Sequence, residues 1–278
     1  AFLFGAVLSG CRKEEAKGPP PKPPVPVKVA TAARQTVPVE LRAVGNVEAV
    51  ATVEIKAQVG GTLAHVHFRE GEEVRKGDPL FTIDPRPFEA TLRQAEAILA
   101  RDQAQLENAR QKERRYGELL TGRFISQQEY DLVQTDAAAL DATVRADRAA
   151  VENAGLRLSW CTIRSPLDGR TGSLMAHAGD LIKADADAPM VVIHQLRPID
   201  VAFAVPEQQL SRIQQQLAAG VVVVQALLPG EEAQPEEGKL TFVDNAVDTA
   251  TGTIRLKGSF ANGVGRLWPG QFVTASLV

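Results

Sequence analysis

Two stretches of this chain carry the same pattern of apolar residues and glycines. The matching pairs share one offset, and they are Ile55 with Ile163, Gly61 with Gly169, Val66 with Leu174, Gly71 with Gly179 and Val74 with Ile182. After a short insertion, Pro79–Ile83 matches Pro189–Ile193. Glycines that recur at turns between alternating apolar residues indicate two similar β-units. Since neither unit buries its apolar face alone, we predict one small β-sandwich from residues 53–86 and 159–196.

The stretch between the two halves, residues 87–158, predicts an antiparallel coiled-coil hairpin. Apolar and small residues recur there at alternating steps of three and four. On the first arm they are Phe88, Leu92, Ala95, Leu99, Asp102, Leu106, Ala109, Glu113, Tyr116 and Leu120. On the second arm they are Tyr130, Val133, Ala137, Leu140, Val144, Asp147, Val151, Ala154 and Leu158.

Residues 121–126 separate the arms as a turn, and Ser126 with Glu129 predicts a capping box at the start of the second helix. The recurring residues of the two arms form the seam, the line along which the helices are expected to pack. This seam is rich in alanine and is interrupted by Asp102 and Asp147. A closed bundle prefers larger apolar residues at such positions, so we expect the hairpin to project from its domain. Gly155 lies inside the second arm and weakens that helix by about 1 kcal/mol relative to alanine.

The N-terminal residues predict export and lipidation. Apolar residues 1–8 are followed by Ser9, Gly10 and Cys11, which match the bacterial lipobox. The run is shorter than the roughly 20 residues that span a bilayer, so residues 1–11 are interpreted as the remnant of a signal peptide, with Cys11 as the lipidated residue. Residues 12–24 form a charged and then proline-rich linker, which remains extended.

Composition and motifs give little support to an enzyme. The net charge is −3, so no basic excess favours nucleic acid as a partner. The chain lacks a phosphate-binding glycine loop, a nucleophile elbow and a zinc-type spacing of Cys and His. His65 and His67 share one face of a predicted strand, but we interpret them as half-exposed strand residues. We therefore expect no catalytic residue, metal or cofactor.

A sandwich of two similar halves resembles the biotinyl and lipoyl carrier domains. In that family the turn between the halves presents a lysine that carries the cofactor. Here the turn reads Asp84-Pro-Arg-Pro87 and continues into the helical hairpin. Because no lysine lies in this turn, the resemblance implies the carrier fold without the carrier activity.

A lipoyl-type sandwich split by a helical hairpin, behind a lipobox, resembles the periplasmic adaptors, or membrane fusion proteins, of resistance–nodulation–division (RND) efflux pumps. The runs that carry this resemblance are residues 66–74, 80–88, 163–172, 244–255 and 267–273. The resemblance implies an elongated, mostly β multi-domain adaptor. It adds a β-barrel from residues 36–52 and 197–278 and a partial membrane-proximal strand from residues 25–35. Most of that last domain is expected to follow Val278, where this sequence stops.

The resemblance also implies partners. The lipid on Cys11 and the barrel hold the inner-membrane RND transporter, and several adaptors associate as a trimer or hexamer. At the hairpin tip the family carries an Arg, a Leu four residues later and a Ser seven residues after that. Arg115, Leu119 and Ser126 have this spacing and are expected to contact the outer-membrane channel.

Two alternatives remain open at this stage. Ser126 and Arg115 also fit a plain helix cap and a solvated helix face. An adaptor for an ABC-type exporter shares the same domains, and it is the second interpretation of the whole chain.

Overall fold

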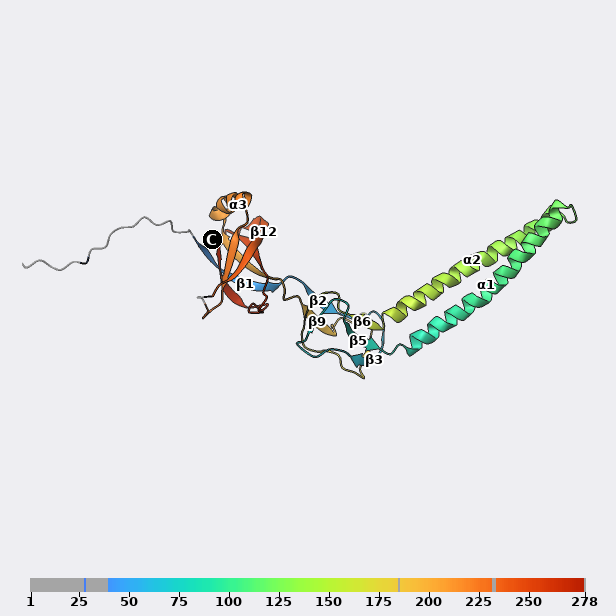
Figure 1. The fold of residues 1–278 in the computed structure, drawn as a ribbon, viewed down its shortest axis with the longest axis horizontal. Coiled ribbons are helices and arrows are strands. Elements are labelled where there is room, and N and C mark those ends of the chain that lie inside the picture. The colour runs from blue at the N-terminus through green and yellow to red at the C-terminus, as the bar shows by residue number, and fades with distance from the viewer. Residues whose placement is uncertain (1–27, 29–39, 185, 232–233, 278) are drawn as a thin grey trace, which may run out of the picture. The chain divides into compact units, whose positions relative to one another are not determined.

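The computed structural model describes residues 28, 40–184, 186–231 and 234–277. Within them, antiparallel strands form a barrel and a sandwich, and two long helices form a hairpin (Figure 1). The signal-peptide, linker and membrane-proximal predictions for residues 1–35, including lipidation of Cys11, lie outside the described residues. Lys28 is the exception, and it is exposed outside regular secondary structure.

The sandwich consists of two four-stranded antiparallel sheets with the same internal order. One sheet contains β2 (Thr52–Ile55), β9 (Val191–His194), β7 (Gly169–Thr171) and β4 (Glu73–Val74). The other contains β6 (Thr162–Arg164), β5 (Pro79–Ile83), β3 (Gly61–Val66) and β8 (Leu181–Ile182). The repeat relates β2 to β6, β9 to β5, β7 to β3 and β4 to β8. The predicted sandwich of two similar halves is confirmed. The halves do not form one sheet each, however, because each sheet takes two strands from each half.

The repeated glycines occupy equivalent positions and serve equivalent purposes. Gly71 and Gly179 have φ angles of +74° and +99°, which glycine adopts without a steric penalty. At Gly61, a Cβ atom would lie 2.7 Å from Cγ2 of Ile83. At Gly169, a Cβ atom would lie 2.9 Å from Cγ2 of Ile193 and 2.6 Å from the carbonyl oxygen of His194. The glycines therefore allow close approach of two buried isoleucines that are themselves related by the repeat.

The core of the sandwich also anchors the base of the hairpin. Leu80, Phe81 and Ile83 of β5 are fully buried, and the ring of Phe68 packs edge-on against Phe81 at 5.3 Å between centroids. Phe88, Leu158 and Trp160, from the base of the two helices and the residue that follows them, pack against this core. The sandwich and the hairpin base therefore share one apolar cluster.

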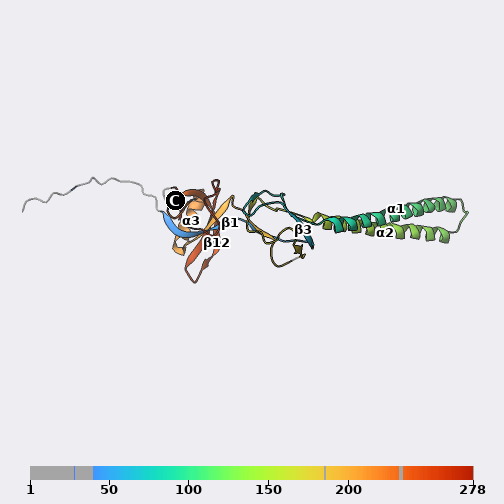
Figure 2. The same ribbon diagram turned by 90° about the horizontal axis from the view of Figure 1, so that it is seen from below.

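The hairpin comprises α1 (Arg86–Thr121) and α2 (Gln127–Ser159), which run side by side in both views (Figures 1 and 2). Each residue of the predicted seam is buried or partly buried, whereas most residues between seam positions are exposed. The seam prediction is confirmed. Fully buried seam residues are Asp102, Leu106, Ala109, Val133, Ala137, Val144 and Ala154.

The chain leaves the sandwich for the hairpin and returns to it at neighbouring points. β5 pairs with β6, with Phe81 opposite Ile163, and the amide of Ile83 donates to the carbonyl of Cys161 at 2.8 Å. The two helices are thus attached to adjacent strands of a single sheet.

The remaining strands close into a six-stranded antiparallel barrel. Its order is β1 (Leu41–Ala49), β10 (Ile199–Pro206), β13 (Thr253–Phe260), β12 (Glu236–Asp248), β11 (Val223–Leu227) and β14 (Phe272–Leu277), and β14 pairs with β1. Between β10 and β11 lie a 3₁₀ turn, η1 (Glu207–Gln209), and the helix α3 (Leu210–Ala219). Ile213 of α3 is fully buried in the barrel core.

Candidate functional site

Backbone amides of the turn at the hairpin tip donate hydrogen bonds to the carbonyl groups at the end of α1. The amide of Gly122 donates to Glu118 O at 3.1 Å, that of Arg123 to Leu120 O at 2.9 Å, and that of Phe124 to Leu119 O at 3.0 Å. Arg123 has a φ angle of +62°, the left-handed conformation that often ends a helix. These bonds fill carbonyls that the helix leaves without an intrahelical partner.

Ser126 begins α2 with the predicted capping box. Its Oγ accepts from the amide of Glu129 at 3.3 Å, and Oε2 of Glu129 accepts from the amide of Ser126 at 2.8 Å. The hydrogen bonds from the Ser126 amide and hydroxyl hold the pKa of Glu129 below its ordinary value. This confirms the capping function of Ser126, which is still exposed at the tip.

Arg115 and Leu119 are one turn apart on the last part of α1, so they lie on the same helix face. Both are exposed, and 41% of the Leu119 surface is accessible. Arg115 lies about 9 Å along the helix axis from Thr121, the last residue of α1.

The structure adds Phe124 to the tip, which the sequence interpretation missed. Phe124 is 79% exposed and follows the left-handed residue of the turn. Its ring lies over Gly122, where a Cβ atom would be 2.6 Å from ring atom Cε2. The sequence did contain an indication of this exposed residue, because an aromatic side chain is unusual inside a short polar turn. Leu132, early in α2, is a further exposed apolar side chain at 66%.

The tip is held in shape by aromatic packing below the turn. The ring of Tyr130, a seam residue of α2, lies 3.6 Å from the position that a Cβ atom on Gly117 would occupy. Tyr116, a seam residue of α1, has the ammonium of Lys112 5.6 Å from its ring centroid. Tyr116 and Tyr130 thus pack in the seam directly below the turn and support the exposed residues of the tip.

The turn that carries lysine in carrier domains serves here to start α1. Pro85 is the N-cap residue of the helix, and Arg86 donates to both carboxylate oxygens of Asp84 at 2.6–3.0 Å. The hydrogen bonds from Arg86 hold the pKa of Asp84 below its ordinary value. This turn presents an ion pair and a helix start, with no amine for acylation.

The structure provides no metal-type arrangement around the two neighbouring histidines. The rings of His65 and His67 are 6.1 Å apart, and Nε2 of His67 is hydrogen-bonded to Oγ1 of Thr82 at 2.8 Å. Across the described residues, no three Cys, His, Asp or Glu side chains gather as metal ligands would. Among the same residues, no helix combines the length and hydropathy needed to cross a membrane.

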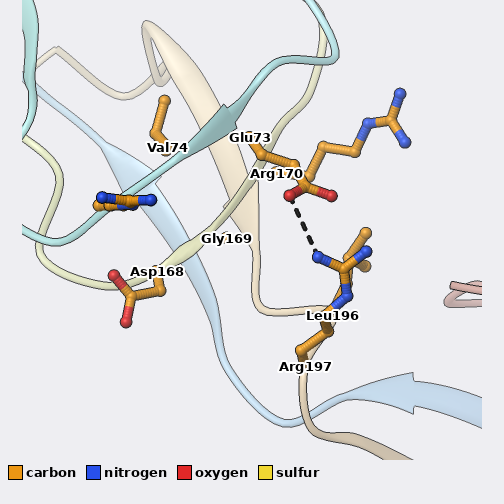
Figure 3. Close-up of a pocket in the computed structure, with 8 residues that line it drawn as sticks. Glu73, Val74, Asp168, Gly169, Arg170, Leu196 and Arg197 are labelled. Carbon is orange, nitrogen blue, oxygen red and sulfur yellow. Dashed lines mark hydrogen bonds and ion pairs between the residues drawn. The ribbon is translucent and has the colours of Figure 1, made fainter. Parts of the chain in front are cut away.

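A cavity of about 580 Å³ lies beside strands β4 and β7 of the sandwich and the link from β9 to β10 (Figure 3). Its lining residues are Glu73, Val74, Arg75, Asp168, Gly169, Arg170, Leu196 and Arg197. Nη1 of Arg197 contacts the carboxylate of Glu73 at 3.1 Å, and its Nε donates to Asn262 O at 3.3 Å. Most of the lining side chains are charged, and none of them is a Ser, Cys or His.

Comparison with known proteins identifies both β-domains. A family model described as the barrel-sandwich hybrid domain of RND MFPs matches residues 51–194. A second, described as the β-barrel domain of RND MFPs, matches residues 198–278. Multidrug resistance protein MdtA of Proteus mirabilis is 42% identical over 259 residues, which cover 93% of this chain and 62% of the relative. Protein MdtA of Escherichia coli is 39% identical over 257 residues, which cover 92% and 62%.

Solved structures share the fold. A MacA–MexA chimera that contains the Pseudomonas aeruginosa MexA α-hairpin domain has a TM-score of 0.66 at 24% identity, over 88% of this chain and 83% of that one. The membrane fusion protein Spr0693 of Streptococcus pneumoniae has a TM-score of 0.65 at 18% identity, over 86% and 98%. The chain spans about 62% of the length of the MdtA relatives. On the strength of the two domain matches and of these relatives, the chain belongs to the membrane fusion proteins of RND systems.

Proposed function

We propose that this chain is a non-catalytic periplasmic adaptor that links an inner-membrane RND transporter to an outer-membrane channel for multidrug efflux. The observation that supports it most is the hairpin. Two helices of 36 and 33 residues leave adjacent strands of one sheet and end in a turn with exposed apolar side chains. An arm of this kind carries a contact surface about 50 Å along its axis from the domain that holds it.

In this proposal the tip contacts the channel through Arg115, Leu119 and Phe124. Leu119 and Phe124 supply apolar surface, and Arg115 supplies a charge with several hydrogen-bond donors. Aromatic and arginine side chains dominate the energetics of many protein interfaces. Ser126 belongs to the same tip but acts by fixing the turn through its capping box. The channel is therefore expected to meet a preformed tip.

The transporter end of the adaptor is assigned to the barrel, and the lipid on Cys11 holds the chain to the inner membrane. Several adaptors side by side form the conduit. The names of the matched domains refer to RND systems and favour that transporter class over an ABC-type exporter. The relatives named as multidrug resistance proteins support drugs as the cargo of the assembled pump.

Drug resistance in a strain that depends on the gene for this chain tests the proposal. Arg115→Asp, and Leu119→Ala combined with Phe124→Ala, should lower resistance while the protein level stays normal. Arg93→Asp is the matched control, because Arg93 is also exposed on α1 but lies about 33 Å from Arg115 along the helix. Full resistance in both tip variants, or equal loss in the control, would show that the tip does not make the contact.

A further inference from the structure

The seam of the hairpin contains two carboxyl groups at one level, and one of them has an orphaned oxygen. Asp102 of α1 is buried at 5% exposure, and Asp147 of α2 is partly buried opposite it. Atom Oδ2 of Asp147 is enclosed and has no hydrogen-bond partner. An enclosed carboxylate oxygen without a donor is costly, so its environment favours the protonated form.

The two groups have different surroundings on α1. Both oxygens of Asp102 accept from the guanidinium of Arg101, at 2.7 Å from Nε and 2.9 Å from Nη2. This bidentate pair holds Asp102 in its ionised form. Asp147 shares no such arginine partner, and burial, followed by the neighbouring carboxyl group of Asp102, raises its pKa.

The residues one turn from Asp147 on its own helix are uncharged, whereas Arg148, the next residue in the chain, is charged and exposed. One turn away lie Thr143, Val144, Ala150 and Val151. The charged groups that face it come from α1 and are Asp102, which repels its negative charge, and Arg101, which partly offsets that repulsion. Leu106 and Val144 close the seam nearby with exposures of 5% and 1%.

We propose that Asp102 and Asp147 share one proton and form a pH-dependent catch between the two arms of the hairpin. When the proton is present, Asp147 donates a hydrogen bond to ionised Asp102 across the seam. When the proton leaves, two negative charges face each other in the seam and oppose the packing of α1 against α2. The inference concerns the hairpin itself and stands whether or not the tip binds a channel.

The direction of the pH effect follows from the two groups. Burial, and then the neighbouring Asp102, raise the pKa of Asp147, so this group binds its proton more tightly in the folded chain than in the unfolded chain. Its contribution to stability is therefore present at low pH and is lost as the pH rises through the raised pKa. The hydrogen bond from Arg101 lowers the pKa of Asp102, so its contribution is lost only in stronger acid. The catch is therefore closed at pH values between the lowered pKa of Asp102 and the raised pKa of Asp147.

Thermal unfolding of the purified chain, followed by the circular dichroism of the helices, tests the proposal. The melting temperature of the wild type should fall as the pH rises from the ordinary range of an aspartate to above the raised pKa of Asp147, and Asp147→Asn should remove this fall. The variant should match the wild type at the lower pH and exceed it at the higher pH, because the asparagine amide is a permanent donor. Asp136→Asn, an exposed carboxylate on the same helix, should keep the slope of the wild type.

An Asp147→Asn variant with the wild-type slope would overturn the proposal. A second readout guards against a variant that only alters packing. In the wild type, the carboxyl ¹³C resonance of Asp147 should titrate above the range of free aspartate, and it should return toward that range in Asp102→Asn. Titration of Asp147 at the ordinary value in the wild type would also overturn the proposal.

Discussion

Replacement of Gly169 by alanine tests the close approach on which the sandwich depends. A Cβ atom there would lie 2.6 Å from the carbonyl oxygen of His194, 2.9 Å from Ile193 Cγ2 and 2.9 Å from Leu167 Cδ1. The first of these atoms is backbone, and Ile193 is fully buried, so neither side can move cheaply. We expect Gly169→Ala to lower the free energy of unfolding by about 1–3 kcal/mol, the usual cost of overpacking.

Gly155→Ala is the matched control with the opposite sign. Gly155 lies inside α2, and apart from its chain neighbours and the nearby backbone of its own helix, no atom lies within 4 Å of the position its Cβ would occupy. Alanine there should stabilise the hairpin by about 1 kcal/mol, because glycine is the poorer helix former. The two substitutions add the same methyl group, so their difference isolates the effect of the surroundings.

Urea unfolding with two probes distinguishes these effects. Both variants are made in a Trp268→Phe background, in which the fluorescence of Trp160 reports on the sandwich because Trp160 packs against its core. Far-ultraviolet circular dichroism reports on the helices. Gly169→Ala should shift the fluorescence midpoint downward, and Gly155→Ala should shift the dichroism midpoint upward. A Gly169→Ala protein as stable as the parent would refute the claim that Gly169 is needed for space.

Three further predictions concern single side chains. Ser126→Ala should cost the hairpin about 1 kcal/mol in thermal unfolding through loss of the cap, whereas Ser126→Asp should retain most of it, and equal losses would argue against the cap. Leu106→Ala should cost about 2–5 kcal/mol because Leu106 is 5% exposed in the seam, whereas exposed Leu132→Ala should change stability by less than about 0.5 kcal/mol in the same melt. Labelled palmitate should enter the wild-type protein and be absent from Cys11→Ser, and equal labelling would contradict lipidation.

The helical hairpin was predictable because its signal is local. Seam residues such as Leu106 and Val144 follow a period set by the helix itself, and Ser126 and Glu129 meet within one turn. The positive φ angles of Gly71 and Gly179 likewise follow from the matched turns. In each case the residues that interact are close in sequence.

Strand pairing was less accessible, because it joins residues far apart in the chain. The repeat established that β5 and β9 are equivalent, but it did not indicate that β9 pairs with β2 and β7 from the two different halves. An alternating pattern fixes which face of a strand is buried, whereas its neighbours depend on the whole sheet. The interleaving of the two halves therefore appears only in three dimensions.

The candidate site likewise contains residues that the sequence indicates and residues that only the structure reveals. Arg115, Leu119 and Ser126 were selected by spacing and resemblance, whereas Phe124 has no periodic signature because it lies in a turn. Asp102 was recognised as an interruption of the seam. Its bidentate bond from Arg101, however, depends on side-chain conformations that the sequence does not specify.

Photo-crosslinking in living cells tests the contact between the hairpin tip and the channel most directly. A photoreactive amino acid replaces Leu119 at the tip, or Gln105 as an exposed control in the middle of α1. After irradiation, the products are identified by mass spectrometry. If the tip docks on the channel, position 119 should give a product with an outer-membrane channel protein and position 105 should give none with that protein. Absence of the channel product at position 119, or equal yield at position 105, would contradict the proposed function.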